Sequence, residues 1–203
     1  CLLKLPGRSL VGMVACAIDD NVQNHQLMLL HGAQGKGKST FIRHLLPPEL
    51  KDYYRNGMII PENNNHLLQL SSCLLINLDE FDTLSPERMQ NLKSLITQDV
   101  VNERKVYDIQ NYTYIRRASF IASTNNPHCM PDVKENRRIL FSTLLNIDYH
   151  TPVNHEGIYA QAYALYRQGF QYWYENEEIT FLNNRNEAFR QKDPLEENLF
   201  FYF

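Results

Sequence analysis

Apolar residues occur in short runs along the chain, and polar or breaker-rich segments separate these runs. Four runs contain no charged side chain: residues 27–30, 73–78, 118–123 and 139–145. Continuous apolar runs of this length are typical of strands that are covered on both faces. We therefore expect each run to form a strand of a central sheet.

Apolar side chains at helical spacing predict helices between and after these strands. The first helix is expected at about residues 10–22, after the breaker Leu5-Pro6-Gly7. A later helix should begin at Pro86, because Ser85 is a favourable N-cap and proline suits the first helical position. Two more helices are predicted over about residues 40–46 and 178–190.

Strands that alternate with helices predict an α/β fold with a central, mainly parallel sheet flanked by helices. Residues 1–150 would form this core with its N-terminal helix, and residues 151–203 a helical appendage of the same structural unit. In such sheets ligands bind at the carboxyl ends of the strands. The segments expected at that edge are Leu30-His31, Leu78-Asp79 and Ser123-Thr124-Asn125.

The C-terminal helical part is rich in aromatic residues. Five of them follow one another at steps of four and three: Tyr159, Tyr163, Tyr166, Phe170 and Trp173. This spacing favours the buried face of a helix, and an exposed stacking surface is the alternative.

Composition narrows the class of protein. The chain has 203 residues and a net charge of −3, so nucleic-acid binding would depend on a local basic patch. Its four cysteines form no C-x-x-C pair, which argues against a zinc or redox motif and favours a reducing, cytoplasmic location.

The N-terminal part of the chain gives two further expectations. The apolar stretch 10–18 is too short to span a bilayer, so no membrane partner is expected. Because the chain begins with Cys1, we expect a domain excised from a longer protein.

One segment carries a specific chemical signature. Residues 32–39 match the pattern G-x-x-x-x-G-K-[ST] at every fixed position, between an expected strand and an expected helix. Such a loop surrounds phosphates with backbone N–H groups, while Lys38 reaches the β- and γ-phosphates and Ser39 binds Mg²⁺. We predict ATP and Mg²⁺ as ligands of this loop, the alternative being an ordinary glycine-rich turn. The residues expected to bind the nucleotide are Gly32, Gln34, Gly35, Lys36, Gly37, Lys38, Ser39 and Thr40.

Polar residues at two other strand ends complete a candidate site for phosphoryl transfer. We assign Asp79 to Mg²⁺ and Glu80 to orienting the attacking water, although both would also suit a solvated strand end. Asn125 is assigned to the γ-phosphate or the water, with Asn126 as its substitute. The alternative for Asn125 is a turn residue before Pro127.

Basic residues dominate the segment 104–138, which contains seven of them against three acidic residues. Arg104 and Lys105 precede a predicted hairpin of strands 106–109 and 112–115, and they are the predicted DNA contacts. A solvated hairpin edge protected by charge is the alternative. Arg137 or Arg138 is expected to neutralise charge on the transferring phosphoryl group from a neighbouring subunit, unless both form surface ion pairs with Asp132 or Glu135.

The motifs together resemble one family. Leu-His-Gly-Ala-Gln-Gly-Lys-Gly-Lys-Ser-Thr-Phe, then Asn-Leu-Asp-Glu-Phe-Asp, Ser-Phe-Ile-Ala-Ser-Thr-Asn and Glu-Asn-Arg-Arg resemble the virulence-associated protein E family, over about residues 27–195. Members of that family are P-loop ATPases of phage and mobile-element replication modules, and they look like superfamily 3 helicases. The family usually has glycine before Asn-Arg-Arg, where this chain has Glu135.

The resemblance implies a function and an assembly. It implies a P-loop NTPase core in which Lys38 and Ser39 are Walker A residues, Asp79 and Glu80 Walker B residues, and Asn125 a sensor. One of Arg137 and Arg138 would be an arginine finger. Superfamily 3 helicases form hexameric rings, so a homo-oligomeric ring and a primase-like domain in the same or a neighbouring chain are also implied.

We therefore expect a Mg²⁺-dependent ATPase that acts as a helicase-like motor on single-stranded or forked DNA. A nucleotide-gated assembly switch without DNA translocation is the main alternative. A small-molecule kinase is a weaker one, because the sensor-like asparagine and the arginine pair do not suit it.

Overall fold

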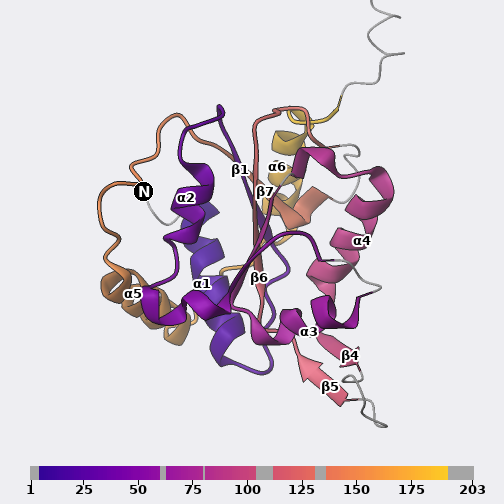
Figure 1. The fold of residues 1–203 in the computed structure, drawn as a ribbon. Coiled ribbons are helices and arrows are strands. Elements are labelled where there is room, and N and C mark those ends of the chain that lie inside the picture. The colour runs from indigo at the N-terminus through magenta and orange to yellow at the C-terminus, as the bar shows by residue number, and fades with distance from the viewer. Residues whose placement is uncertain (1–4, 60–62, 80, 104–111, 131–135, 192–203) are drawn as a thin grey trace, which may run out of the picture.

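A central sheet of five parallel strands organises the computed structural model, which describes residues 5–59, 63–79, 81–103, 112–130 and 136–191 (Figure 1). The strand order is β2-β3-β6-β1-β7. The strands are β1 (Leu27–His31), β2 (Tyr54–Asn56), β3 (Leu75–Leu78), β6 (Ser119–Thr124) and β7 (Ile139–Thr143). All neighbouring pairs are parallel, so every strand ends at the same edge.

Four of these strands lie on the four apolar runs, as predicted. β3 is buried at every position, because strands and helices cover it on all sides. The fifth strand, β2, is an edge strand of three residues that pairs only with β3. Its sequence, Tyr-Arg-Asn, has no apolar run, so the hydrophobic pattern does not reveal it.

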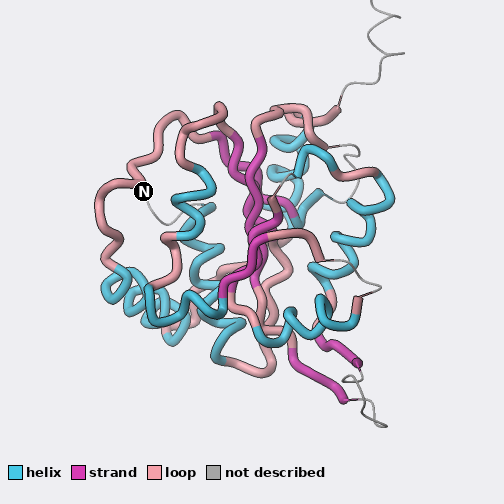
Figure 2. The backbone as a smooth tube through the Cα atoms, viewed as in Figure 1, coloured by secondary structure: helices cyan, strands magenta, loops and turns pink. Residues whose placement is uncertain are grey.

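Helices cover both faces of the sheet (Figures 1 and 2). The apolar side chains of α1 and α2 pack on one face with Leu30 and Ile121, whereas those of α3 and α4 pack on the other with Ile76 and Phe120. The helices are α1 (Leu5–Ile18), α2 (Lys38–Arg43), α3 (Asn64–Ser72), α4 (Pro86–Thr97), α5 (His155–Arg167) and α6 (Asn176–Glu187). Short 3₁₀ turns add η1 (Pro48–Tyr53), η2 (Phe81–Thr83) and η3 (Asn136–Arg138). In the described part of the chain, no helix is both long and apolar enough to cross a bilayer.

The helix boundaries correct several expectations. α1 begins at Leu5 rather than at residue 10, because Pro6 falls in the first turn, where a missing N–H breaks no hydrogen bond. α2 begins at Lys38, two residues before the predicted start, and ends at Arg43. α4 begins as predicted, with the Ser85 hydroxyl accepting a hydrogen bond from the Arg88 N–H at 3.3 Å.

The hairpin uses a different first strand from the predicted one. β4 (Val100–Glu103) pairs antiparallel with β5 (Tyr112–Ile115), and the two strands extend away from the core (Figure 1). Val101 is completely buried in the main core cluster, so β4 is anchored to the core at this residue. The predicted first strand, residues 106–109, lies outside the described residues.

The aromatic series is mainly helix core, as predicted. Tyr159, Tyr166 and Phe170 pack on a cluster that α1 shares with α5. Tyr163 and Trp173 do not belong to it, and their exposed fractions are 47% and 43%. α5 ends before Phe170, because Gly169 takes a left-handed conformation with φ of 76°.

Alkaline pH is expected to destabilise both this cluster and the main core, which contains Cys129. Burial raises the pKa of Tyr159 and of Tyr172 to about 12, and that of the Cys129 thiol to about 11. In the unfolded chain these groups lose their protons near their ordinary values of 10.0 and 9.0. Their contribution to stability is therefore complete below about pH 9 and is lost as the pH rises through about 12.

Urea unfolding followed by circular dichroism at increasing pH measures this loss. The midpoint should fall between about pH 9 and pH 11, and Tyr159→Phe should reduce the slope. Tyr163→Phe, at an exposed position of the same helix, should leave the slope as it is. A midpoint that stays constant over this range would contradict the assignment.

Candidate functional site

A glycine loop connects β1 to α2 at the carboxyl edge of the sheet. Gly35 and Gly37 have φ angles of 76° and 80°, which favour glycine over any residue with a Cβ. Gly32 is restricted by space, since a Cβ there would lie 3.1 Å from the carbonyl oxygen of Leu144. The Gly32 N–H donates to the Thr124 carbonyl at 3.2 Å, which ties the loop to the end of β6.

Lys38 is the charged centre of this loop. Its ammonium donates to the carbonyl oxygens of Gly32 at 2.6 Å and Ala33 at 2.9 Å, and to Oδ1 of Asn125 at 2.7 Å. Burial lowers the pKa of Lys38, and the negative charge of Asp82 opposes this effect. A phosphate oxygen is a stronger acceptor than these neutral oxygens, so the ammonium is well placed to bind an anion at the loop.

Two asparagines hold Asp79 at the end of β3. The buried Asn77 amide donates to Oδ1 of Asn56 at 2.6 Å, and the Asn56 amide donates to Oδ2 of Asp79 at 2.7 Å. One Asp79 oxygen is thereby fixed in position. A carboxylate oriented in this way is typical of a ligand for a hard cation.

Asp82 connects η2 to the end of β6. Its carboxylate accepts hydrogen bonds from the Thr124 hydroxyl and, at 3.2 Å, from the Asn125 N–H. This contact orients Asn125, whose side chain then reaches Lys38. We did not predict Asp82 as a site residue, although an acid at the fourth position of Asp-Glu-Phe-Asp was the available signal.

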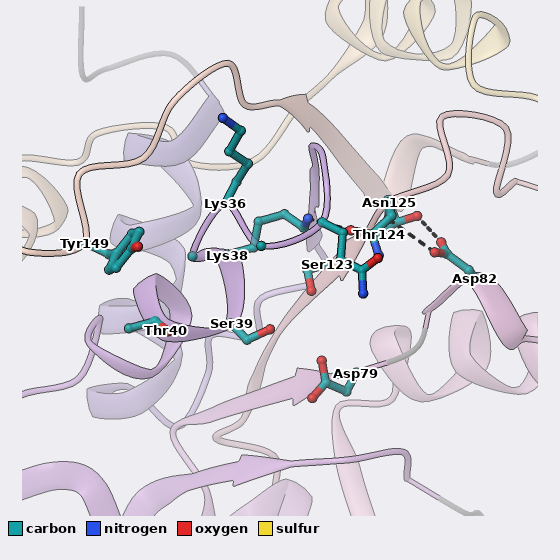
Figure 3. Close-up of a pocket in the computed structure, with 13 residues that line it drawn as sticks. Lys36, Lys38, Ser39, Thr40, Asp79, Asp82, Ser123, Thr124, Asn125 and Tyr149 are labelled. Carbon is teal, nitrogen blue, oxygen red and sulfur yellow. Dashed lines mark hydrogen bonds between the residues drawn. The ribbon is translucent and has the colours of Figure 1, made fainter.

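Lys38, Asp79, Asp82 and Asn125 line one pocket of about 640 Å³ (Figure 3). Within it the Ser39 hydroxyl and the Asp79 carboxylate point into the same region. Hydroxyl and carboxylate oxygens suit Mg²⁺, which commonly takes few protein ligands and keeps several waters. The lining residues are Gln34, Gly35, Lys36, Gly37, Lys38, Ser39, Thr40, Asp79, Asp82, Ser123, Thr124, Asn125 and Tyr149.

The pocket brings together most of the residues predicted to bind nucleotide and metal. Residues 34–40 line it together with Asp79 and Asn125, and Gly32 contacts the Lys38 ammonium through its carbonyl. Glu80, Arg104 and Lys105 lie outside the described residues.

Arg137 and Arg138 lie at the opposite edge of the sheet. They form η3 immediately before β7, whose first residue, Ile139, is level with Leu27 at the start of β1. The carboxyl edge with the pocket is at the other end of these strands. Neither arginine lines the pocket of its own chain.

The basic segment is less available to DNA than its composition suggests. Arg116 is completely buried and donates to the carbonyl oxygens of Ala118 at 2.9 Å and Asn24 at 2.8 Å. Arg117 forms an ion pair with Asp20. Burial therefore excludes Arg116 from a DNA-binding patch, whereas Arg117 joins the segment before β6 to Asp20, which follows α1.

Comparison with known protein families and structures identifies the family of this chain. The family model of the virulence-associated protein E-like domain matches residues 4–191. Two apo structures of the NrS-1 C-terminal region share its fold, with TM-scores of 0.53 and 0.54 at 15% sequence identity. They cover 95% and 96% of this chain, which spans only 48% and 51% of theirs. No curated protein matches the sequence significantly. The chain therefore belongs to the virulence-associated protein E-like family.

Proposed function

We propose that this domain binds ATP with Mg²⁺ and hydrolyses it as a helicase-like motor in the DNA replication of a phage or mobile element. One observation carries the proposal. The start of α2 and the ends of β3 and β6 bring Lys38, Asp79 and Asn125 into a single pocket beside the glycine loop. Phosphoryl transfer to water uses a cation at the phosphates, a carboxylate that binds Mg²⁺, and a polar side chain that positions the attacking water.

Each residue of the site would have a different role in ATP hydrolysis. The backbone N–H groups of the glycine loop and the Lys38 ammonium would hold the β- and γ-phosphates. Ser39 and Asp79 would hold Mg²⁺, which neutralises charge on the phosphates. Asn125 would position the γ-phosphate or the attacking water, and Glu80 would orient that water.

The proposal includes a ring of identical chains. The described residues that line the pocket include no arginine, and both candidate arginines lie at the far edge of the sheet. In a ring, a head-to-tail interface would bring the far edge of one copy to the pocket of the next.

The proposal also assigns DNA contacts. The β4–β5 hairpin extends from the core, and Arg104 and Lys105 directly follow β4, where they would meet DNA.

ATP hydrolysis with and without single-stranded DNA tests this function. We expect Mg²⁺-dependent phosphate release that DNA stimulates, and DNA affinity that falls as salt increases. The full-length protein should be measured beside the isolated domain, because ring contacts can lie outside this chain. Absence of hydrolysis in both would refute the motor.

A nucleotide-gated assembly switch is the second candidate. Arg116, one of the seven basic residues in the segment 104–138, is completely buried, and this favours a function without DNA binding. A switch would form ATP-dependent oligomers without salt-sensitive DNA binding. Light scattering with ATP, combined with the DNA titration, separates the two candidates.

The Asn77–Asn56–Asp79 chain predicts the effect of a residue outside the pocket. Asn56→Leu removes the donor that fixes Asp79 and should weaken Mg²⁺ affinity by about 10-fold or more. The measurement is the Mg²⁺ concentration that gives half-maximal ATP binding. Asn65→Leu, at an exposed position on α3, is the control. An unchanged Mg²⁺ requirement in Asn56→Leu would exclude the positioning role.

A further inference from the structure

The pocket has two chemically different ends. Asp79, Asp82 and Asn125 lie at one end, and Tyr149 lies at the other, beside the glycine loop (Figure 3). Among the described lining residues Tyr149 is the only aromatic one. A nucleoside triphosphate has the same polarity, with a charged polyphosphate at one end and a flat, weakly polar base at the other.

Tyr149 is fitted closely to the glycine loop. The Cδ1–Cε1 edge of its ring lies against Gly37, so that a Cβ on Gly37 would overlap the ring. Position 37 therefore requires glycine for two reasons: its backbone is left-handed, and the Tyr149 ring occupies the place of a Cβ. The ring remains partly exposed toward the pocket that it lines.

The segment that carries Tyr149 is held in place by its neighbours. The Asp148 carboxylate accepts hydrogen bonds from the N–H groups of His150 at 3.1 Å and Thr151 at 3.0 Å, and from the Thr151 hydroxyl at 2.6 Å. The His150 ring lies against Tyr149 with a centroid separation of 4.2 Å. The start of the segment is tied to β1, since the Leu144 N–H donates to the His31 carbonyl at 2.7 Å.

We propose that Tyr149 stacks on the base of the bound nucleotide and selects purine over pyrimidine triphosphates; this inference rests on the proposed function. The loop fixes the phosphates between the two ends of the pocket, so the base extends toward the aromatic end. Aromatic rings bind bases through their flat faces, and a two-ring purine offers more stacking area than a pyrimidine. Tyr149 is a binding residue in this role, because it contacts the base and not the reacting atoms.

Calorimetric titration with MgATP, MgCTP and magnesium tripolyphosphate tests the assignment. Tyr149→Ala should weaken ATP binding about 10-fold and reduce the preference for ATP over CTP. Tyr149→Phe should bind ATP like the parent protein, because it retains the ring. Tripolyphosphate has no base, so its affinity should be the same in Tyr149→Ala and the parent. Tyr163→Ala, an exposed tyrosine of α5, is the matched control.

Other outcomes overturn the inference in distinguishable ways. If the parent binds ATP and Tyr149→Ala binds it equally well, stacking is excluded and the nucleotide site stands. If Tyr149→Ala binds both ATP and tripolyphosphate more tightly, the ring obstructs the loop instead of supporting a base. If the parent protein binds neither ligand, the proposed function and the base platform fail together.

Discussion

Lys38→Ala is expected to abolish ATP hydrolysis and to weaken ATP binding by about 100-fold or more. The Lys38 ammonium is the buried cation of the glycine loop, and neutral oxygens hold it in position. An anion bound at the loop would exchange these neutral acceptors for charged ones. Without the ammonium, the phosphates would face only backbone N–H groups and any bound Mg²⁺.

The structure also indicates how to separate this effect from a loss of folding. Lys38 donates to Asn125, so its removal alters a contact between α2 and the end of β6. Circular dichroism and the thermal midpoint of Lys38→Ala therefore have to be compared with those of the parent. Lys51→Ala, an exposed lysine on η1, is the matched control and should hydrolyse ATP normally. Undiminished ATP binding by a folded Lys38→Ala protein would remove Lys38 from the site.

The sequence predicts those parts of the site that lie in a contiguous motif or directly after a continuous apolar run. The glycine loop is a contiguous motif, and its conformation follows from glycine at Gly35 and Gly37. Asp79 and Asn125 each follow an apolar run. Because all strands of the sheet are parallel, residues that follow strands meet at one edge.

The same rule places Arg137 and Arg138 on the far edge, because they precede an apolar run instead of following one. Their position is compatible with action between subunits, which stays a prediction. The sequence does not distinguish the two arginines. In the structure Arg137 is exposed and Arg138 is partly buried.

The site residues that the sequence did not predict lie on irregular segments or on very short strands. Asn56 lies on an edge strand of three polar or aromatic residues, which carries no hydrophobic pattern. Tyr149 lies in the irregular segment between β7 and α5, where no periodicity relates it to a loop more than a hundred residues earlier. Arg116 is one of the seven basic residues in the segment 104–138, and only the three-dimensional structure shows that carbonyl oxygens accept its hydrogen bonds inside the protein.

The second large effect is expected at the far edge of the sheet. Replacing the arginine that acts in trans should lower the rate of ATP hydrolysis by about 1,000-fold or more. ATP binding should remain close to that of the parent protein, because neither arginine lines the pocket of its own chain. Arg137→Ala and Arg138→Ala, measured separately, identify which side chain is responsible.

Mixing two inactive variants provides the decisive measurement for the second effect. Lys38→Ala chains keep their arginines, and the arginine variant keeps its glycine loop. In a mixed ring at equal amounts, about a quarter of the interfaces combine an intact loop with an intact arginine of the neighbour. Activity should therefore reappear on mixing, at about a quarter of the parent rate if each interface acts independently. A double variant carrying both substitutions, mixed with Lys38→Ala, should stay inactive, because no chain in that mixture has an intact loop. If the first mixture also stays inactive while both variants assemble, the arginine does not act between subunits and the switch becomes the better description.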